Sequence, residues 1–138
     1  MSEKISNLKI SDNKISLHYD GQDISYQIKI VPHEMWVASW DFYNPTIFFD
    51  KNLQRQYRTP MAIHEAIEKY VCERYGLNEH DEGHRIAEYI EEEWFVKTFG
   101  KKKLYDYNHE YDKIQRNEWF SFLKKHKFKH EKGHVFKV

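Results

Sequence analysis

The middle of this chain predicts two consecutive helices joined by a short turn, and this pair limits the folds that the chain can adopt. Thr59 and Pro60 predict the start of the first helix, because threonine is a good N-cap and proline is favoured at the first helical position. Gly76 is expected to end that helix as its left-handed cap. A second helix is predicted from Asn78 or Asp81 onward. Helices joined by so short a turn pack antiparallel, so one face of each is expected to meet the other.

The first fifty residues have a different periodicity, which is typical of β-strands. Ile15–Tyr19 and Ile24–Ile30 alternate apolar and polar residues, and Asp20-Gly21 between them predicts a tight hairpin turn. Met35–Trp40 is a short apolar run that suits a third strand, and Thr46–Asp50 suits another. The chain is therefore predicted to be an α+β protein in which a small antiparallel N-terminal sheet packs on two to three helices.

The remaining elements complete a single domain. The second helix is expected to end near Phe99-Gly100, and a third to cover much of Asn108 to His126. A chain of 138 residues is enough for one compact domain and too short for two comfortable ones. We therefore predict one domain over residues 1–126, followed by a basic tail over residues 127–138.

Composition narrows the setting in which the protein works. No apolar run approaches the 18 residues of a membrane-spanning helix, and the first residues lack the apolar core of a signal peptide. Cys72 is the single cysteine, which excludes an internal disulfide framework and suits a reducing compartment. These features predict a cytoplasmic protein that does not interact with a membrane.

Charge is unevenly distributed although the net charge is zero. Residues 61–95 carry three basic and ten acidic groups, a net charge of −7, and residues 96–138 carry twelve basic and five acidic groups, a net charge of +7. An acidic middle suggests a cation site, and a basic end suggests a surface that contacts anions. Neutralisation of one segment by the other within the fold explains the same pattern equally well.

The acidic segment contains two His/Glu pairs at helical spacing. His64 and Glu68 are four residues apart and share a face of the first helix, and Glu65 directly follows His64. His84 and Glu88 have the same spacing on the second helix. If the two polar faces meet, imidazole and carboxylate groups from both helices converge, and such groups bind divalent metal ions.

This arrangement resembles the gluzincin branch of the zincin metallopeptidases, with a degenerate motif in which the second histidine is Glu68. The resemblance covers roughly residues 46–95. It implies that His64 is the first zinc ligand, that Glu68 occupies the second ligand position and that Glu88 is the third ligand. His84, one turn before Glu88, is an alternative ligand or a group that orients substrate. The resemblance also implies that Glu65 is the catalytic base that activates a metal-bound water.

The carboxylate of Glu68 changes the expected chemistry. Two carboxylates and one imidazole neutralise the charge of Zn²⁺, so bound water is acidified less than with neutral ligands. A mixed nitrogen and oxygen ligand set also suits Mn²⁺ or Fe²⁺, which leaves the identity of the metal open. The leading hypothesis is a metal-dependent hydrolase and specifically a small peptidase, with Thr46–Asp50 as an edge strand that holds an extended peptide.

The same residues are consistent with other interpretations. The His/Glu pairs also suit ordinary polar helix faces, with Glu91–Glu93 as a solvated stretch, and Cys72 suits an inert buried position better than a ligand. A non-catalytic zincin-like domain that binds a protein partner is the main alternative. Nucleic-acid binding is a weaker one, because lysines such as Lys124 and Lys125 alternate with aromatic residues in the last third of the chain.

Overall fold

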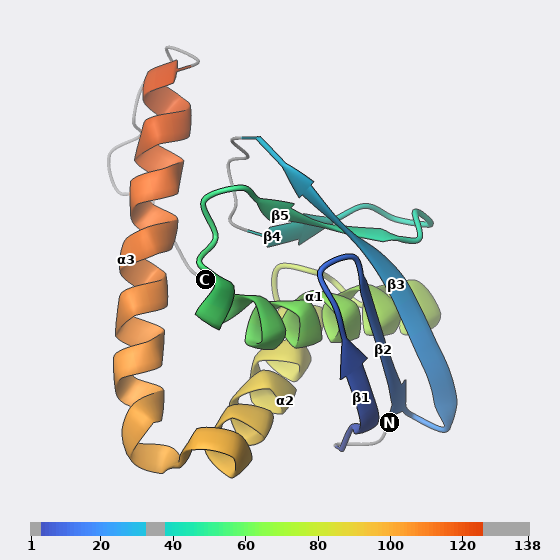
Figure 1. The fold of residues 1–138 in the computed structure, drawn as a ribbon. Helices are drawn as coiled ribbons and strands as arrows, with labels where there is room; N and C mark the ends of the chain where they lie inside the picture. The colour runs from blue at the N-terminus through green and yellow to red at the C-terminus, as the bar shows by residue number, and fades with distance from the viewer. Residues whose placement is uncertain (1–3, 33–37, 126–138) are drawn as a thin grey trace.

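The computed structural model describes residues 4–32 and 38–125, with side chains as far as Asn117. The described elements, in chain order, are β1 (Ser6–Ile10), β2 (Lys14–Tyr19), β3 (Gln22–Val31), β4 (Ala38–Trp40), β5 (Thr46–Asp50), α1 (Arg55–Tyr75), α2 (Glu82–Phe99) and α3 (Lys101–Lys125) (Figure 1).

The strands form one sheet in the order β1-β2-β3-β5-β4. The α+β class is therefore confirmed, but the sheet is mixed and not wholly antiparallel, because β3 and β5 run parallel. The chain places β4 at the edge before it turns back through Asn44-Pro45, and β5 then returns beside β3 in the same direction as β3. The prediction that Thr46–Asp50 is an edge strand was wrong, since β5 lies between two strands.

The hairpin between β2 and β3 is confirmed. Asp20 and Gly21 both have positive φ, at 55° and 72°, as the primed two-residue turn requires. Tyr19 pairs with Gln22 across this turn, so the alternation along β2 directs Ile15, Leu17 and Tyr19 to the same face. The sequence pattern did not single out β1, which adds a fifth strand beside β2.

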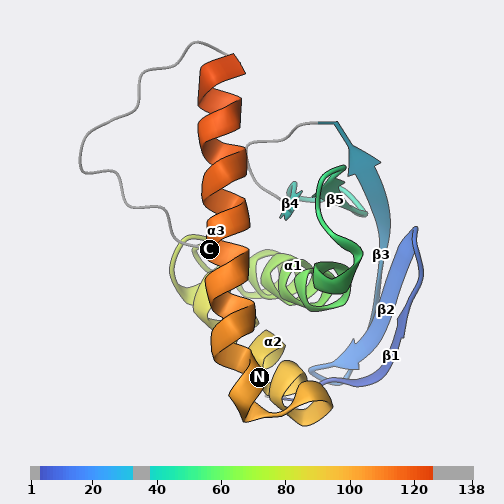
Figure 2. The same ribbon diagram turned by 60° about the vertical axis from the view of Figure 1, so that its left-hand side comes forward.

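Helix α1 is the central element of the fold. The curved sheet covers one side of α1, whereas α2 and α3 lie on the other (Figures 1 and 2). Ile63, Ile67 and Val71 of α1 are fully buried, as are Ile47 and Phe49 of β5. Burial on both sides explains why polar side chains of α1 are also enclosed.

The starts of two helices differ from the predictions. Helix α1 begins at Arg55, four residues before Thr59, because Tyr57 is buried against Tyr107 of α3 with ring centroids 5.7 Å apart. This packing stabilises a first turn that local propensity did not indicate. Helix α3 begins at Lys101, directly after Gly100, and not at Asn108.

The helix ends agree better with the sequence. Gly76 caps α1 in the left-handed conformation, with φ of 68°, and its N–H donates to the carbonyl of Cys72. Helix α2 follows Asp81 and ends at Phe99, as expected. Within the described ranges, none of the helices is long and apolar enough to cross a membrane.

Some predictions lie outside the described residues. They concern the basic tail over residues 127–138 and the side chains of Lys124 and Lys125, on which nucleic-acid binding depends. The first part of the predicted strand Met35–Trp40 also lies outside, and its last three residues form β4.

Candidate metal centre

His64, Glu68 and His84 meet where α2 returns across α1. Nε2 of His64 lies 3.2 Å from Oε2 of Glu68 and 3.2 Å from Nδ1 of His84. Nδ1 of His84 lies 3.2 Å from the same oxygen of Glu68. The three atoms therefore form a nearly equilateral triangle, and together they make a group that could hold a metal ion.

The size of this triangle suits a first-row divalent ion. An ion about 2.1 Å from each atom, the usual distance for zinc bound to imidazole, would lie about 1 Å above the plane of the triangle. The angles between the bonds would then be about 100°, between the tetrahedral and octahedral values. The three side chains would thus occupy one face of the ion and leave the opposite face available for other ligands.

A carboxylate on α2 orients the first histidine. Nδ1 of His64 lies 2.7 Å from Oε1 of Glu91, which as a carboxylate accepts a hydrogen bond from this nitrogen. Tyr107 of α3 donates its hydroxyl to the other oxygen of Glu91 at 2.5 Å. Histidines that bind metals commonly donate their second nitrogen to a carboxylate in this way, which fixes the tautomer and the ring orientation.

This hydrogen bond favours a positive charge, either a proton or a metal ion, at the triangle. Because Nδ1 of His64 keeps its proton and donates it in a hydrogen bond to Glu91, Nε2 of a neutral His64 would present its lone pair to the carboxylate of Glu68. A proton or a metal ion at Nε2 removes that repulsion. Burial alone would lower the pKa of His64, but hydrogen bonds to Glu68 and Glu91 outweigh it and hold the pKa well above its usual value.

Glu68 is the ionised partner in this group. Burial opposes ionisation, but hydrogen bonds with His64, His84 and Trp40 outweigh burial and lower the pKa of Glu68 to about 2. Nε1 of Trp40, on the edge strand β4, donates to Oε1 of Glu68 at 2.8 Å. The two carboxylate oxygens therefore have different partners, and only Oε2 faces the histidines.

Glu65 lies beside the triangle on α1 and is only 7% exposed. Burial and the neighbouring charge of Glu68 raise the pKa of Glu65 to about 8. Tyr111 of α3 is near enough that, after burial, the charges of Glu65 and Glu91 raise the pKa of its hydroxyl. Glu65 thus occupies the enclosed region between α1 and α3.

Glu88 lies on the outer side of the cluster. Its Oε2 is 3.7 Å from Nε2 of His84, the ring nitrogen that faces away from the triangle, and Glu88 is not in the group of three. The side chains of His84 and Glu88 are 25% and 46% exposed, against 7% for His64 and 11% for Glu68. Solvent or a ligand would therefore reach the triangle from the side of α2.

A close approach of backbone and side chain brings α2 into position. A Cβ at Gly83, in the first turn of α2, would lie 2.4 Å from Sγ of Cys72 on α1. Only glycine lets the two helices come this close, and His84 is the next residue. Cys72 packs at this contact, where burial raises the pKa of its thiol to about 12, and it is not one of the three grouped residues.

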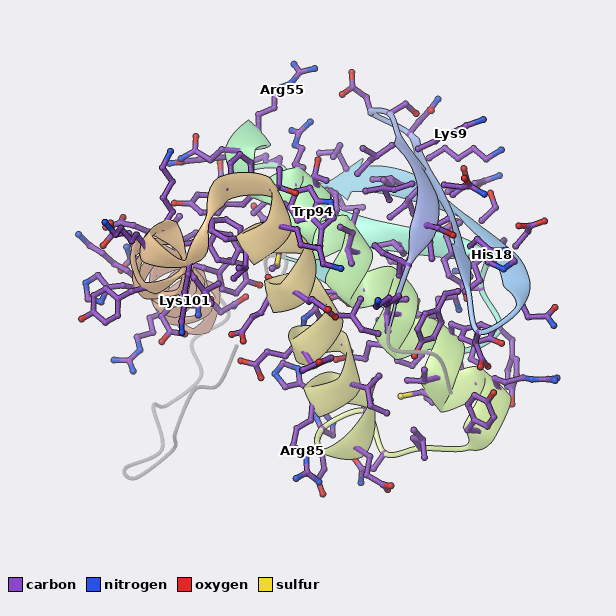
Figure 3. All side chains as sticks on the ribbon, turned by 90° about the horizontal axis from the view of Figure 1, so that it is seen from below. Lys9, His18, Arg55, Arg85, Trp94 and Lys101 are labelled. Atoms are coloured by element: carbon purple, nitrogen blue, oxygen red, sulfur yellow. The ribbon has the colours of Figure 1, made fainter. Side chains whose placement is uncertain are left out.

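Neighbouring residues on α2 point elsewhere and offer matched controls. Figure 3 shows Arg85 directed away from the rest of the molecule at the start of α2, where it pairs with Asp81 at 3.0 Å. Trp94 lies towards the other end of α2, with its ring centroid 5.9 Å from that of Phe99.

Sequence reasoning missed three residues that support the cluster: Trp40, Glu91 and Tyr107. A signal for Glu91 was present, since it lies two helical turns after His84 on the same face. The interpretation of Glu91–Glu93 as a solvated stretch was wrong for Glu91, which is 5% exposed. Trp40 and Tyr107 come from distant elements, and no local spacing points to them.

Comparisons with protein-family models, curated proteins and solved structures gave no match.

Proposed function

We propose that this protein is a metal-dependent hydrolase that binds a divalent ion through His64, Glu68 and His84. The observation that carries the proposal is the triangle of three ligand atoms with 3.2 Å edges, built from two imidazoles and one carboxylate. Such a ligand set suits Zn²⁺, and also Mn²⁺ or Fe²⁺.

The residues around the triangle have distinct roles in this proposal. A bound ion would supply a Lewis acid that makes water a better nucleophile at neutral pH. Glu91 keeps Nε2 of His64 available for the ion by accepting a hydrogen bond from the protonated Nδ1. Glu65 follows the first ligand, as in the zincins. The positive charge of a bound ion would lower the raised pKa of Glu65, and the ionised carboxylate would then take and return the proton.

The expected substrate is a peptide, following the resemblance to metallopeptidases. Strand β4, not β5, is the edge strand nearest the cluster, because Trp40 at its end contacts Glu68. An extended peptide would add to such an edge through main-chain hydrogen bonds. We also propose that the protein works in the cytoplasm, where a reducing environment keeps the buried Cys72 as a thiol.

Hydrolysis of a panel of unstructured peptides, measured with Zn²⁺, Mn²⁺ or Fe²⁺, tests the proposal. Glu65→Gln should abolish hydrolysis while the protein retains its metal. The matched control is Glu93→Gln on α2, where the side chain is partly exposed and pairs with Lys97 at 3.6 Å. Unchanged hydrolysis in Glu65→Gln would contradict the role of Glu65.

A non-catalytic metal site is the second candidate. The low exposure of His64 and Glu68 and the carboxylate in a ligand position favour it, because both reduce the reactivity expected of a bound ion. The ion would then fix α1 against α2 in a domain that binds a protein partner. This candidate predicts stoichiometric metal, no hydrolysis with any ion, and partner binding that Glu65→Gln leaves intact.

A further inference from the structure

Trp40 connects the edge strand of the sheet to a ligand of the candidate metal centre. Its Nε1 donates to Oε1 of Glu68 at 2.8 Å, and both side chains are buried. The other oxygen of Glu68 is the one that lies 3.2 Å from each histidine nitrogen. The indole thus separates the two carboxylate oxygens into one that is held by the protein and one that faces the ion site.

This separation matters because the carboxylate of Glu68 occupies the position of the second histidine in the zincin motif that the sequence resembles. An imidazole offers a single nitrogen to a metal, whereas a carboxylate can bind through one oxygen or through both. A glutamate also has one more rotatable bond than a histidine, so its orientation needs more support.

We propose that Trp40 is a positioning residue that restricts Glu68 to binding the ion through Oε2 alone. The inference rests on the metal site of the proposed function and adds a requirement for an indole N–H at residue 40. With one oxygen engaged, Glu68 takes one coordination position, and the face of the ion opposite the triangle stays open for water or substrate.

A buried lysine fixes the indole in place. Nζ of Lys69 lies 5.4 Å from the ring centroid of Trp40 and 5.4 Å from that of Tyr26. It also donates to the carbonyl of Asp41 at 2.7 Å and to Glu73 at 2.8 Å. Lys69 is 1% exposed and directly follows Glu68 in α1, so it ties the chain after β4 to the turn that carries the ligand.

The backbone after β4 has a second attachment to the same helix. The N–H of Tyr43 donates to the carboxylate of Glu73, which also pairs with Lys69. Phe42 packs edge-on against Trp40, with ring centroids 4.8 Å apart. The contacts of Lys69 and Phe42 with the indole therefore limit its rotation away from Glu68.

The test compares Trp40→Phe with the control Trp94→Phe, because phenylalanine keeps an aromatic ring at residue 40 but lacks the N–H. Titration with Co²⁺ should give an affinity about tenfold to a hundredfold weaker in Trp40→Phe than in the wild type or the control. The visible Co²⁺ absorption should also weaken, since binding through both oxygens raises the coordination number. Thermal unfolding of the metal-free protein establishes that both variants fold.

A double substitution separates positioning from packing. In Glu68→His the ligand has no second oxygen to restrain, so adding Trp40→Phe should not weaken Co²⁺ binding further. Equal affinity and equal spectra in Trp40→Phe and the wild type would overturn the inference, as would the same loss in both backgrounds. If the wild type binds no Co²⁺, the metal site itself is overturned. If the wild type binds Co²⁺, a change in Trp40→Phe reports on the role of Trp40 alone.

Discussion

Gly83→Ala should weaken metal binding, whereas the metal-free protein should still fold. The added Cβ would lie 2.4 Å from Sγ of Cys72 and 3.3 Å from the carbonyl oxygen of Asn78, whereas ordinary contacts begin at 3.4 Å. Cys72 is 2% exposed, so its sulfur has little room to turn aside, and the start of α2 is expected to move by about 1 Å. His84 is the next residue and moves with it.

The expected magnitude follows from the geometry of the triangle. A shift of about 1 Å lengthens the two edges at His84 from 3.2 Å to about 4 Å. An ion with bonds of about 2.1 Å then loses favourable geometry at one ligand, and we expect its affinity to fall at least tenfold to a hundredfold. Overpacking destabilises by about 1–3 kcal/mol, but alanine in place of glycine in a helix restores about 1 kcal/mol.

Zn²⁺ titration calorimetry and thermal unfolding of the metal-free protein measure the two effects separately. Cys72→Ala removes the sulfur that the new Cβ would contact, so Cys72→Ala with Gly83→Ala should regain most of the lost affinity. Cys72→Ala alone is the matched control. Wild-type affinity in Gly83→Ala, or a double variant as weak as Gly83→Ala, would refute the argument that this contact places His84.

Three further predictions concern protons and hydrogen bonds at the cluster. Zn²⁺ affinity should rise with pH by up to about tenfold per unit, because the pKa of His64 is raised and the ion has to displace the proton that His64 keeps. Calorimetry that shows no change in affinity between pH 6 and 8 would contradict this. The pKa of Glu65 is raised from 4.5 to about 8, so the unfolded chain releases its proton first and the free energy of unfolding of the metal-free protein falls as pH rises between these values. Relative to Glu65→Gln, the fall should be up to about 5 kcal/mol in urea unfolding, and equal slopes for the two proteins would refute it. Tyr107→Phe removes the donor that holds Glu91, and should weaken Zn²⁺ binding about tenfold, whereas unchanged affinity would show that Glu91 needs no such support.

The parts of the fold that could be predicted correctly from the sequence depend on local interactions. Asp20 and Gly21 adopt positive φ within a two-residue turn, and Gly76 adopts it at a helix end, so adjacent residues determine each structure. The parallel pairing of β3 with β5 joins segments separated by β4, and nothing in either strand specifies that partner. The early start of α1 likewise depends on Tyr57 packing against α3.

In the candidate site, too, some residues are brought together by local structure and others only by tertiary packing. His64 and Glu68 are brought together by the helical repeat alone, so predicting a helix for this segment is enough to place them on one face. Their meeting with His84 requires the close helix contact at Gly83, a residue that by sequence only weakens a helix. Trp40 reaches Glu68 from a strand 28 residues away, and its role becomes visible only when the sheet is placed on α1.

The metal content of the purified protein shows whether His64, Glu68 and His84 bind an ion. The protein should be purified without added metal and without a histidine tag, and wild type compared with His64→Ala and with the control Arg85→Ala. We expect near-stoichiometric zinc, manganese or iron in the wild type and in Arg85→Ala, and its loss in His64→Ala. An absence of metal from all three proteins, persisting after reconstitution with each ion, would contradict the account and leave the cluster as a buried ion-pair network.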